Sequence, residues 1–451
     1  MKRIGFIAMS GVRAHNPELT RLGLTLPGFV ERNRIIASLP SLGLLTLAGL
    51  TPREVEVEYR EVVELASCRD EFDYDVVAIS SFSAQILEAY SLADRLRAAG
   101  TRVILGGLHV TALPDEAAGH SDAVVLGEGE PAWPAVVADL MRGDLQPAYD
   151  ARPHPFDLSL APMPRFELLD PSRYNRLTVQ TQRGCPFNCE FCAASVRLSR
   201  RYRVKPVDKV IAEIRRIKEI WPRPFIEFAD DNSFANRRHG KRLMRALAGE
   251  HVRWFTETDI SVARDEELLA MMRDAGCAQV IIGLESPSAD GLRGLEKSAD
   301  WKARQRDFYF EAIHRIQDHG ISVNGCFVLG LDGTGPDSFD EVRRFVRESG
   351  LHEVQITILT PFPGTPLYGR LKREGRLTHD GEWDRCTLFD VNFVPERMTV
   401  EELERDFTAL ARDLYGEEET ARRKESFYQQ LRASVRNRHE QWRERHERKM
   451  G

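Results

Sequence analysis

Residues 183–192 read Arg-Gly-Cys-Pro-Phe-Asn-Cys-Glu-Phe-Cys, so three and then two residues separate Cys185, Cys189 and Cys192. Three thiolates at this C-x3-C-x2-C spacing suit a four-iron, four-sulfur cluster in which one iron has no protein ligand and can bind a small molecule. Structural zinc prefers four ligands in paired motifs, and no second pair follows. The stretch therefore predicts a [4Fe-4S] cluster on these three cysteines.

The remaining cysteines are scattered, which argues against a zinc site and against a disulfide framework; they are Cys68, Cys277, Cys326 and Cys386. The N-terminus is too quickly interrupted by charge to be a signal peptide, and no apolar run approaches the length of a membrane span. A net charge of −6 and 42% hydrophobic residues indicate a globular enzyme, with nothing global that favours nucleic acid. We expect a reduced, cytoplasmic location.

Strand and helix patterns alternate on both sides of the cysteine stretch. A strand at 178–181 leads into it, and five helix–strand pairs follow, the last strand running from 353 to 359. Such alternation predicts parallel sheets with helices on their faces. Counting the first strand, residues 176–375 form six βα units and one domain.

Residues 1–145 alternate in the same way and predict a doubly wound parallel sheet. The segments 75–80, 102–105 and 123–126 are short β-branched or aliphatic runs, as strands buried on both faces require. Ligands of such sheets bind beyond the carboxyl ends of the strands. The residues at those ends are Ser80–Ser83, Gly106–His109 and Gly127–Glu130.

Two segments connect or extend these domains. Six prolines between 146 and 175 indicate an extended linker. Residues 376–451 predict a helical C-terminal element, in which Thr399 and Glu402 form a capping box. Its charged end carries a narrow apolar stripe, which favours a solvated helix packed on the body over a membrane or nucleic-acid surface. The basic segment 11–38 fits no strand–helix unit and is expected to be a surface loop, with a lid over the cavity between the domains as the alternative.

The cysteine stretch, with Arg-Gly-Cys-Pro at its start and an aromatic residue directly before Cys192, resembles the cluster loop of radical S-adenosylmethionine (radical SAM) enzymes. The strand ends Ser80–Ser83, Gly106–His109 and Gly127–Glu130 resemble the cobalamin-binding domain that precedes the barrel in one branch of that family. The D-x-H-x-x-G motif that supplies an axial histidine to cobalamin is absent, so His109 is a poor candidate for a cobalt ligand.

The resemblance implies an α/β fold: a doubly wound parallel-sheet (B12-binding-like) domain, a partial (β/α)6 TIM-type radical SAM barrel and a helical C-terminal tail. It also implies site residues. The candidates for SAM contacts are Phe191, Glu227, Asp230, Asp231, Ser261 and Glu285, and those for a cobalamin site are Ser80, Ser81, Gly106 and Gly107. Helix capping is at least as good an explanation for Asp231 or Asn232, and an arginine of the fold would serve Glu285 as well as SAM does. No catalytic residue beyond the cluster is assigned.

The leading function implied by the resemblance is radical methyl transfer from methylcobalamin to a small molecule, with an electron donor such as flavodoxin or ferredoxin. One alternative is cobalamin-independent transfer of the 3-amino-3-carboxypropyl group of SAM to a soft acceptor such as trivalent arsenic, as in arsinothricin biosynthesis. Thiols such as Cys326 or Cys277 would hold that acceptor. A second alternative is a non-catalytic redox or corrinoid sensor.

Overall fold

The N-terminal part of the chain builds a parallel sheet of six strands. The computed structural model describes residues 3–22, 39–69, 71–193 and 201–450. The strand order is β2-β1-β3-β4-β5-β6, and the order reverses between β1 and β3, where doubly wound sheets bind their ligands. The strands are β1 Arg3–Met9, β2 Glu56–Val62, β3 Val76–Ser81, β4 Arg102–Gly106, β5 Ala123–Leu126 and β6 Ala148–Asp150.

Helices cover both faces of this sheet, as its apolar strands require. The helices α2 (Leu42–Leu50) and α6 (Gly129–Arg142) pack on one face, in the hydrophobic core that continues into the second domain. The helices α3 (Ile86–Ala98), α4 (Leu108–Ala112) and α5 (Pro114–Gly119) pack on the other face in a separate cluster. The expected doubly wound domain is therefore present.

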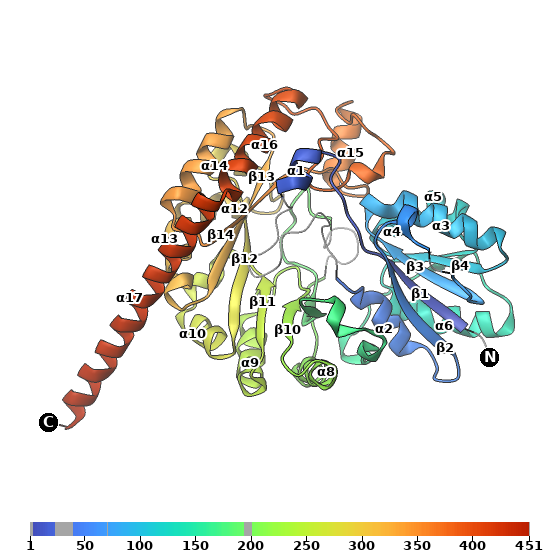
Figure 1. Ribbon diagram of the computed structural model, residues 1–451, viewed down its shortest axis with the longest axis horizontal. Coiled ribbons are helices and arrows are strands. Elements are labelled where there is room, and N and C mark those ends of the chain that lie inside the picture. The colour runs from blue at the N-terminus through green and yellow to red at the C-terminus, as the bar shows by residue number, and fades with distance from the viewer. Residues whose placement is uncertain (1–2, 23–38, 70, 194–200, 451) are drawn as a thin grey trace.

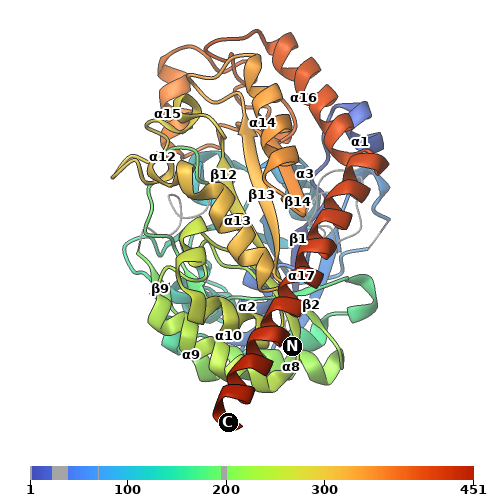
Figure 2. The ribbon, with the colours of Figure 1, turned by 90° about the vertical axis from the view of Figure 1, so that its left-hand side faces the viewer.

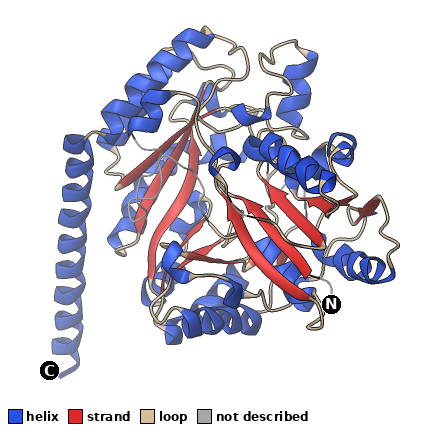
Figure 3. Cartoon of the chain, turned by 45° about the vertical axis from the view of Figure 1, so that its right-hand side comes forward, coloured by secondary structure: helices blue, strands red, loops and turns tan. Residues whose placement is uncertain are grey.

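The second sheet also has six parallel strands, and its spatial order is the chain order β7-β10-β11-β12-β13-β14. Its strands are β7 Leu177–Val179, β10 Phe225–Phe228, β11 Arg253–Glu257, β12 Cys277–Glu285, β13 Ser322–Leu329 and β14 Glu353–Ile358. Among the described residues β14 does not pair with β7, so the barrel is partial, as expected. Its open side faces the N-terminal domain (Figures 1 and 3).

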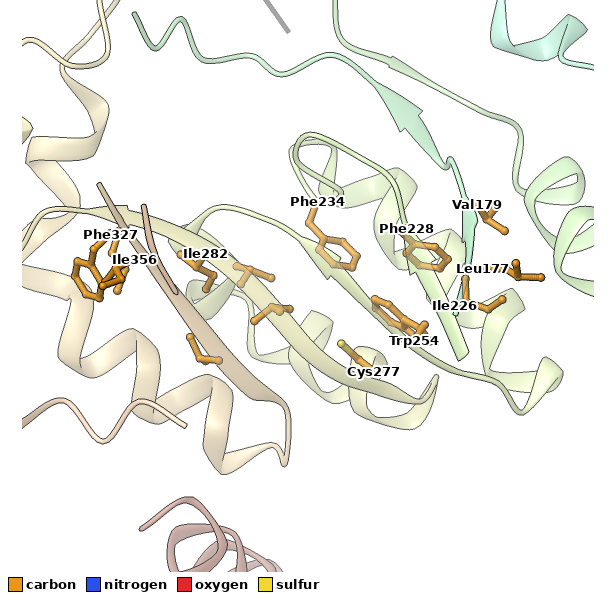
Figure 4. Packing of buried hydrophobic residues seen from close by; sticks show 14 of the residues in the cluster. Leu177, Val179, Ile226, Phe228, Phe234, Trp254, Cys277, Ile282, Phe327 and Ile356 are labelled. Atoms are coloured by element: carbon orange, nitrogen blue, oxygen red, sulfur yellow. The ribbon is translucent and has the colours of Figure 1, made fainter. Parts of the chain in front are cut away.

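Helices wrap the outside of this curved sheet (Figure 1). They are α8 Val207–Ile220, α9 Arg237–Leu247, α10 Glu266–Asp274, α13 Tyr309–Asp318 and α14 Asp337–Glu348. Side chains alternate along each strand, so one set meets the helices and the other lines the barrel interior. Figure 4 shows the helix-facing set, in which Phe228 stacks on Trp254 with ring centroids 4.8 Å apart.

The C-terminal element joins the two domains. The helix α15 (Pro366–Arg373) lies after the last barrel strand, and α16 (Val400–Tyr415) begins with the predicted capping box of Thr399 and Glu402. The helix α17 (Glu417–Met450) packs against α13 and then extends past the body (Figures 1 and 2). The short helix α1 (Pro17–Leu22) contacts α16, and residues 23–38 of the predicted surface loop lie outside the described residues.

Two elements differ from the sequence-based expectation. The strand β6 lies inside the proline-rich segment 146–175, where it adds a sixth strand beside β5. The helix α6 starts at Gly129, so Pro131 lies in its first turn, where proline costs little because the first N–H groups have no helical partner; Pro134 lies inside the helix.

Candidate active site

The cysteine stretch forms a loop that a short antiparallel ladder closes. The strands β8 (Gln182–Arg183) and β9 (Arg203–Val204) pair around it. Gly184 follows β8 with a φ of +87°, a left-handed backbone that favours glycine. The loop therefore leaves the barrel mouth directly beyond β7, the first barrel strand.

The three cysteines of this loop fit ligands of a cluster. Cys189 is buried, and Cys185 and Cys192 are partly exposed. Burial raises the pKa of the Cys185 thiol to about 11 and that of Cys189 to about 12, and the charge of the neighbouring Cys192 thiol adds to both rises. The thiols thus lie near one another, and binding to iron would remove their protons. No group of His, Cys, Asp or Glu in the described ranges is arranged around a single metal ion.

A buried carboxylate holds the outer side of the loop. Glu296 accepts hydrogen bonds from the backbone N–H groups of Asn188 (3.2 Å), Ser298 (2.9 Å), Ala299 (2.9 Å) and Trp301 (3.3 Å). Burial by itself raises the pKa of Glu296, but these four donors favour the charged form and bring it down to about 2. Segment 295–301 therefore fixes the backbone between the first two cysteines.

The C-terminal element holds the same loop from another side. Glu190 accepts a hydrogen bond of 2.6 Å from Arg370 on α15 and pairs with Lys297 at 2.8 Å. Its own carbonyl accepts from the N–H of Leu367 at 3.2 Å. Phe191, a predicted SAM contact, is partly buried and packs against the main core. The loop is thus clamped between the barrel and α15.

The segment after β10 supports the loop from inside. The Gly184 N–H donates to Asp231 at 3.0 Å, and the Asn232 amide lies 4.0 Å from the Cys185 sulfur. The same amide donates to Asp259 at 2.9 Å. The sequence around Asn232 predicts helix capping and no contact with the cluster cysteines. The structure makes it a link between the first cysteine and the strand end of β11.

The Asp230 carboxylate accepts its hydrogen bonds from groups of the protein itself. Its carboxylate accepts from the N–H groups of Thr181 (2.7 Å) and Gln182 (3.1 Å), from the Thr181 hydroxyl and from Ser233 (2.7 Å). Burial raises its pKa to about 6 in spite of these donors. Asp230 therefore joins the ends of β7 and β10, and Asp231 beside it is the member of the pair that reaches the cysteine loop.

Glu285 ends β12 and has a lysine as its partner. Its φ is +63°, and its carboxylate pairs with Lys302 of the short helix α12 (Trp301–Gln305). Lys302 also donates to the Gly283 carbonyl at 2.8 Å, and a Cβ at Gly283 would lie 2.3 Å from the Glu285 carboxylate. Glycine at 283 thus leaves room for the pair. Burial lowers the pKa of Lys302, but Glu285 and the Cys189 thiol outweigh it and raise that pKa.

Further carboxylates line the barrel interior. Glu227 pairs with Arg176, whose guanidinium lies 5.8 Å from the Phe255 ring centroid. The Glu257 carboxylate has no hydrogen-bond or ion-pair partner in the described part of the chain; this side chain alternates with helix-facing Thr256 and is exposed to the interior. The surrounding protein and the negative charges of Glu227 and other acids raise its pKa to about 8. The interior therefore suits a cationic ligand such as SAM.

Other predicted residues lie in different surroundings. The hydroxyl of Ser261, in the turn that follows β11, accepts at 2.6 Å from Arg237, the first residue of α9. Cys326 lies on the interior side of β13, opposite Gly283 in the adjacent strand. Cys277 is buried at the start of β12 among core residues (Figure 4). The two thiols considered for a soft acceptor are thus at different strand positions and on different sides of the sheet.

Two carboxylates of the N-terminal domain bind arginines that flank the cysteine loop. Arg183, at the start of the loop, pairs with Glu130 at 2.7 Å and Glu128 at 3.2 Å. Arg203, at its end, pairs with Glu128 and also donates to the Phe156 carbonyl. Both carboxylates are buried and belong to the strand end 127–130. This cluster, called here the interdomain ion-pair cluster, joins the N-terminal strand ends to the cysteine loop.

At the remaining N-terminal strand ends, Ser80, Ser81, Gly106 and Gly107 form a cradle of small residues. Ser80 and Ser81 end β3 at the switch point beside β1, and Gly106 pairs with Ser80 in the register. Gly107 has a φ of +109°, and a Cβ there would lie 3.3 Å from the Ser80 hydroxyl. These backbone and hydroxyl groups fit a large ring that lies against the sheet edge, such as a corrin.

The His109 side chain has a structural role. It is fully buried, with its ring nitrogens 3.1 Å from the Ser83 hydroxyl and 3.3 Å from Glu116. Glu116 also accepts from the indole N–H of Trp383 at 3.1 Å, and that ring packs edge-on against the imidazole. The histidine therefore joins the N-terminal domain to the C-terminal element.

Comparisons with known proteins match this arrangement. The model of the radical SAM superfamily matches residues 179–346, that of the B12 binding domain matches 37–137, and a domain of unknown function (DUF4070) matches 365–450. An uncharacterized methyltransferase of Synechocystis sp. is 32% identical over 84% of this chain and 71% of its own length. Bacteriochlorophyllide d C-12(1)-methyltransferase of Chlorobaculum tepidum is 28% identical, over 83% and 82%.

A solved structure shares the fold. The radical SAM methyltransferase TsrM from Kitasatospora setae, with cobalamin and a [4Fe-4S] cluster bound, aligns with a TM-score of 0.60 at 15% identity, over 90% of this chain and 82% of that one. Among the helices that the structure describes, none is both long and apolar enough to pass through a bilayer.

Proposed function

This chain belongs to the radical SAM superfamily and carries a B12-binding domain ahead of the radical SAM domain. From that premise we propose that it transfers a methyl group to a small-molecule acceptor in a cobalamin-dependent reaction. When bound, the cluster would supply the electron that cleaves SAM, and the corrinoid would supply the methyl group. Cys185, Cys189 and Cys192 would hold the cluster, and Ser80, Ser81, Gly106 and Gly107 would contact the corrinoid.

The interdomain ion-pair cluster is the observation that carries this proposal. Glu128 and Glu130 follow one strand end of the B12-binding domain, and the arginines that they bind flank the cysteine loop. The strand end 127–130 of the B12-binding domain is therefore held against the cysteine loop. Methyl transfer to a radical formed beside the cluster requires such proximity, because the reacting atoms must be within contact distance.

Side chains at the mouth of the barrel would favour the binding of SAM. Glu227 and Glu285 are paired with Arg176 and Lys302, so among these carboxylates Glu257 is the one whose charged form a positive group of SAM would stabilise. Asp231 and Asn232 orient the cysteine loop, and we assign Asp231 and Glu285 to the side of the cavity where SAM would bind. Relatives named as methyltransferases support methyl transfer, and they give no support to transfer of the 3-amino-3-carboxypropyl group.

Anaerobic reconstitution tests the proposal. The protein would be loaded with iron, sulfide and hydroxocobalamin, passed through gel filtration, and incubated with SAM and dithionite. We expect a retained corrinoid, with an absorption spectrum that lacks histidine ligation, and 5′-deoxyadenosine as the cleavage product by mass. Replacement of Cys185, Cys189 or Cys192 by Ala should abolish cleavage and most bound iron. Release of methylthioadenosine in place of 5′-deoxyadenosine, or no retained corrinoid, would overturn cobalamin-dependent methyl transfer.

A further inference from the structure

The outer face of α9 concentrates positive charge on a chain whose net charge is negative. The helix reads RRHGKRLMRAL and contains no acidic residue. Five of its side chains line an open depression of about 510 Å³: Arg237, Arg238, Lys241, Arg242 and Arg245. The exposed members recur every three or four residues, so they form one continuous stripe along the helix. This stripe is called here the basic face of α9.

The protein neutralises only part of this face. Lys241 pairs with Asp265 at 2.9 Å and with Glu267 at 2.8 Å, and Arg245 lies 3.6 Å from Glu267. Arg238 and Arg242 are exposed and have no acidic partner among the residues that the structure describes. Like charges this close repel one another unless a partner compensates them. The face therefore has an excess of positive charge available to an acidic partner.

The basic face begins close to the cysteine loop. Asn236 is the N-cap of α9, and its N–H donates to the Tyr202 hydroxyl at 3.2 Å. The Tyr202 hydroxyl donates to Gln182, and the amide of Gln182 donates to the carbonyl of Asn232, whose side chain contacts the Cys185 sulfur. A few hydrogen-bonded side chains thus separate the start of the basic face from the first cluster cysteine.

We propose that the basic face of α9 is the docking surface for a small acidic electron-carrier protein that reduces the cluster. The inference rests on the proposed function, because a cluster that cleaves SAM must receive one electron from outside for each reductive cleavage. The reduced carrier loses one electron, and the cluster passes from its 2+ to its 1+ state. Electron transfer falls steeply with distance, so a carrier must bind near the cysteine loop, and complementary charge steers such encounters.

Charge reversal tests the docking surface. The variant Arg238→Glu, Arg242→Glu would be compared with Arg53→Glu, Arg344→Glu, which makes the same change in net charge at exposed sites on the first domain and on α14. Each reconstituted protein would be mixed anaerobically with reduced flavodoxin or reduced ferredoxin, and bleaching of the cluster absorbance would be followed by stopped flow. This readout measures cluster reduction without requiring SAM cleavage.

We expect the α9 variant to accept electrons from the carrier at least tenfold more slowly than the natural protein at low salt, and the difference to shrink as salt rises. Dithionite should bleach both variants to the same end point, which shows an intact cluster. Equal carrier-driven rates in the natural protein and the α9 variant, or an equal loss in the control variant, would overturn the inference. Loss of SAM cleavage with dithionite in the natural protein would instead defeat the proposed function.

Discussion

Single side chains determine the geometry of the cysteine loop. Glu296 is only 2% exposed, yet it remains charged because four backbone N–H groups point at it. Burying a carboxylate without such donors would be costly, and the usual result is a raised pKa. Here the donors outweigh burial, so the carboxylate orders the turn at 298–301 and the adjacent cysteine loop together.

Replacement Glu296→Gln should remove this stabilisation in a pH-dependent way. The folded-state pKa of about 2 lies below the unfolded value of 4.5, so the contribution is complete above about pH 4.5 and is lost as pH falls toward 2. Because one pKa unit is worth about 1.4 kcal/mol, we expect a loss of about 3 kcal/mol at pH 7. Urea unfolding of the apoprotein at pH 7 and at pH 3 measures it.

The control for this variant is Glu311→Gln, which removes an exposed carboxylate paired with Arg315 on α13. An exposed helical pair contributes only about 0.5 kcal/mol, so this variant should unfold almost as the natural protein does. A Glu296→Gln cost that is the same at pH 3 and pH 7 would show that shape, and not charge, is what the carboxylate provides.

At the scale of residues, the sequence predicted the site only where the interacting residues are close together in the chain. Cys185, Cys189 and Cys192 are close in the chain, and their spacing alone indicates a cluster. Lys302 and Asn232 gave no such signal, because each meets its partner only after strands and loops have folded. Whether the predicted SAM and cobalamin contacts bind those ligands stays a prediction.

At the scale of elements, buried strands were the most predictable feature. Continuous β-branched runs identify β3 and β5 within a residue or two, since both faces of a central parallel strand are apolar. The strand β6 could not be predicted from the sequence, because it is a short edge strand in a proline-rich segment and its sequence is only Ala-Tyr-Asp. The helix α6 was hidden by Gly129, Pro131 and Pro134, which read as a loop when burial is unknown.

The strand-end cradle makes an element-level prediction. Replacement Gly107→Leu would place a side chain at φ +109° and against the Ser80 hydroxyl. We expect the variant to lose hydroxocobalamin during gel filtration, while its bound iron is unchanged, since the cysteine loop lies in the other domain. The absorption of corrinoid and the iron content of the eluted protein provide the measurement.

Gly143→Leu is the matched control for that variant. Gly143 also has a left-handed backbone, with φ +78°, but no atom lies within 4 Å of its Cβ position and it follows α6, away from β3 and β4. Both variants place a side chain at a positive φ, with more strain at Gly107 (ψ −171°) than at Gly143 (ψ 18°), and only Gly107→Leu fills the cradle. If both lost corrinoid equally, strain in the sheet would explain the result and the cradle would not be the binding site.

At the scale of the whole molecule, domain placement depends on contacts that the sequence did not predict. Glu128 and Glu130 suggested a ligand loop, and the structure shows that they bind Arg183 and Arg203. Trp383, in a segment without a sequence signal, packs on His109 of the first domain. Charged groups paired across an interface have no local periodicity, so only the folded chain reveals them.

The double replacement Glu128→Gln, Glu130→Gln should uncouple the two domains. It leaves Arg183 and Arg203 partly buried without carboxylates, and breaking a buried ion pair costs about 3–5 kcal/mol. We expect the natural protein to unfold in one thermal transition and the variant in two, because the interface would no longer unite the domains in one cooperative unit. Scanning calorimetry, together with proteolysis of the linker 151–175, measures this change.

The matched variant Glu167→Gln, Glu219→Gln removes carboxylates that pair with Arg216 at more exposed positions and should preserve one transition. A single, unshifted transition in the first variant would show that the C-terminal element alone holds the B12-binding domain over the barrel mouth.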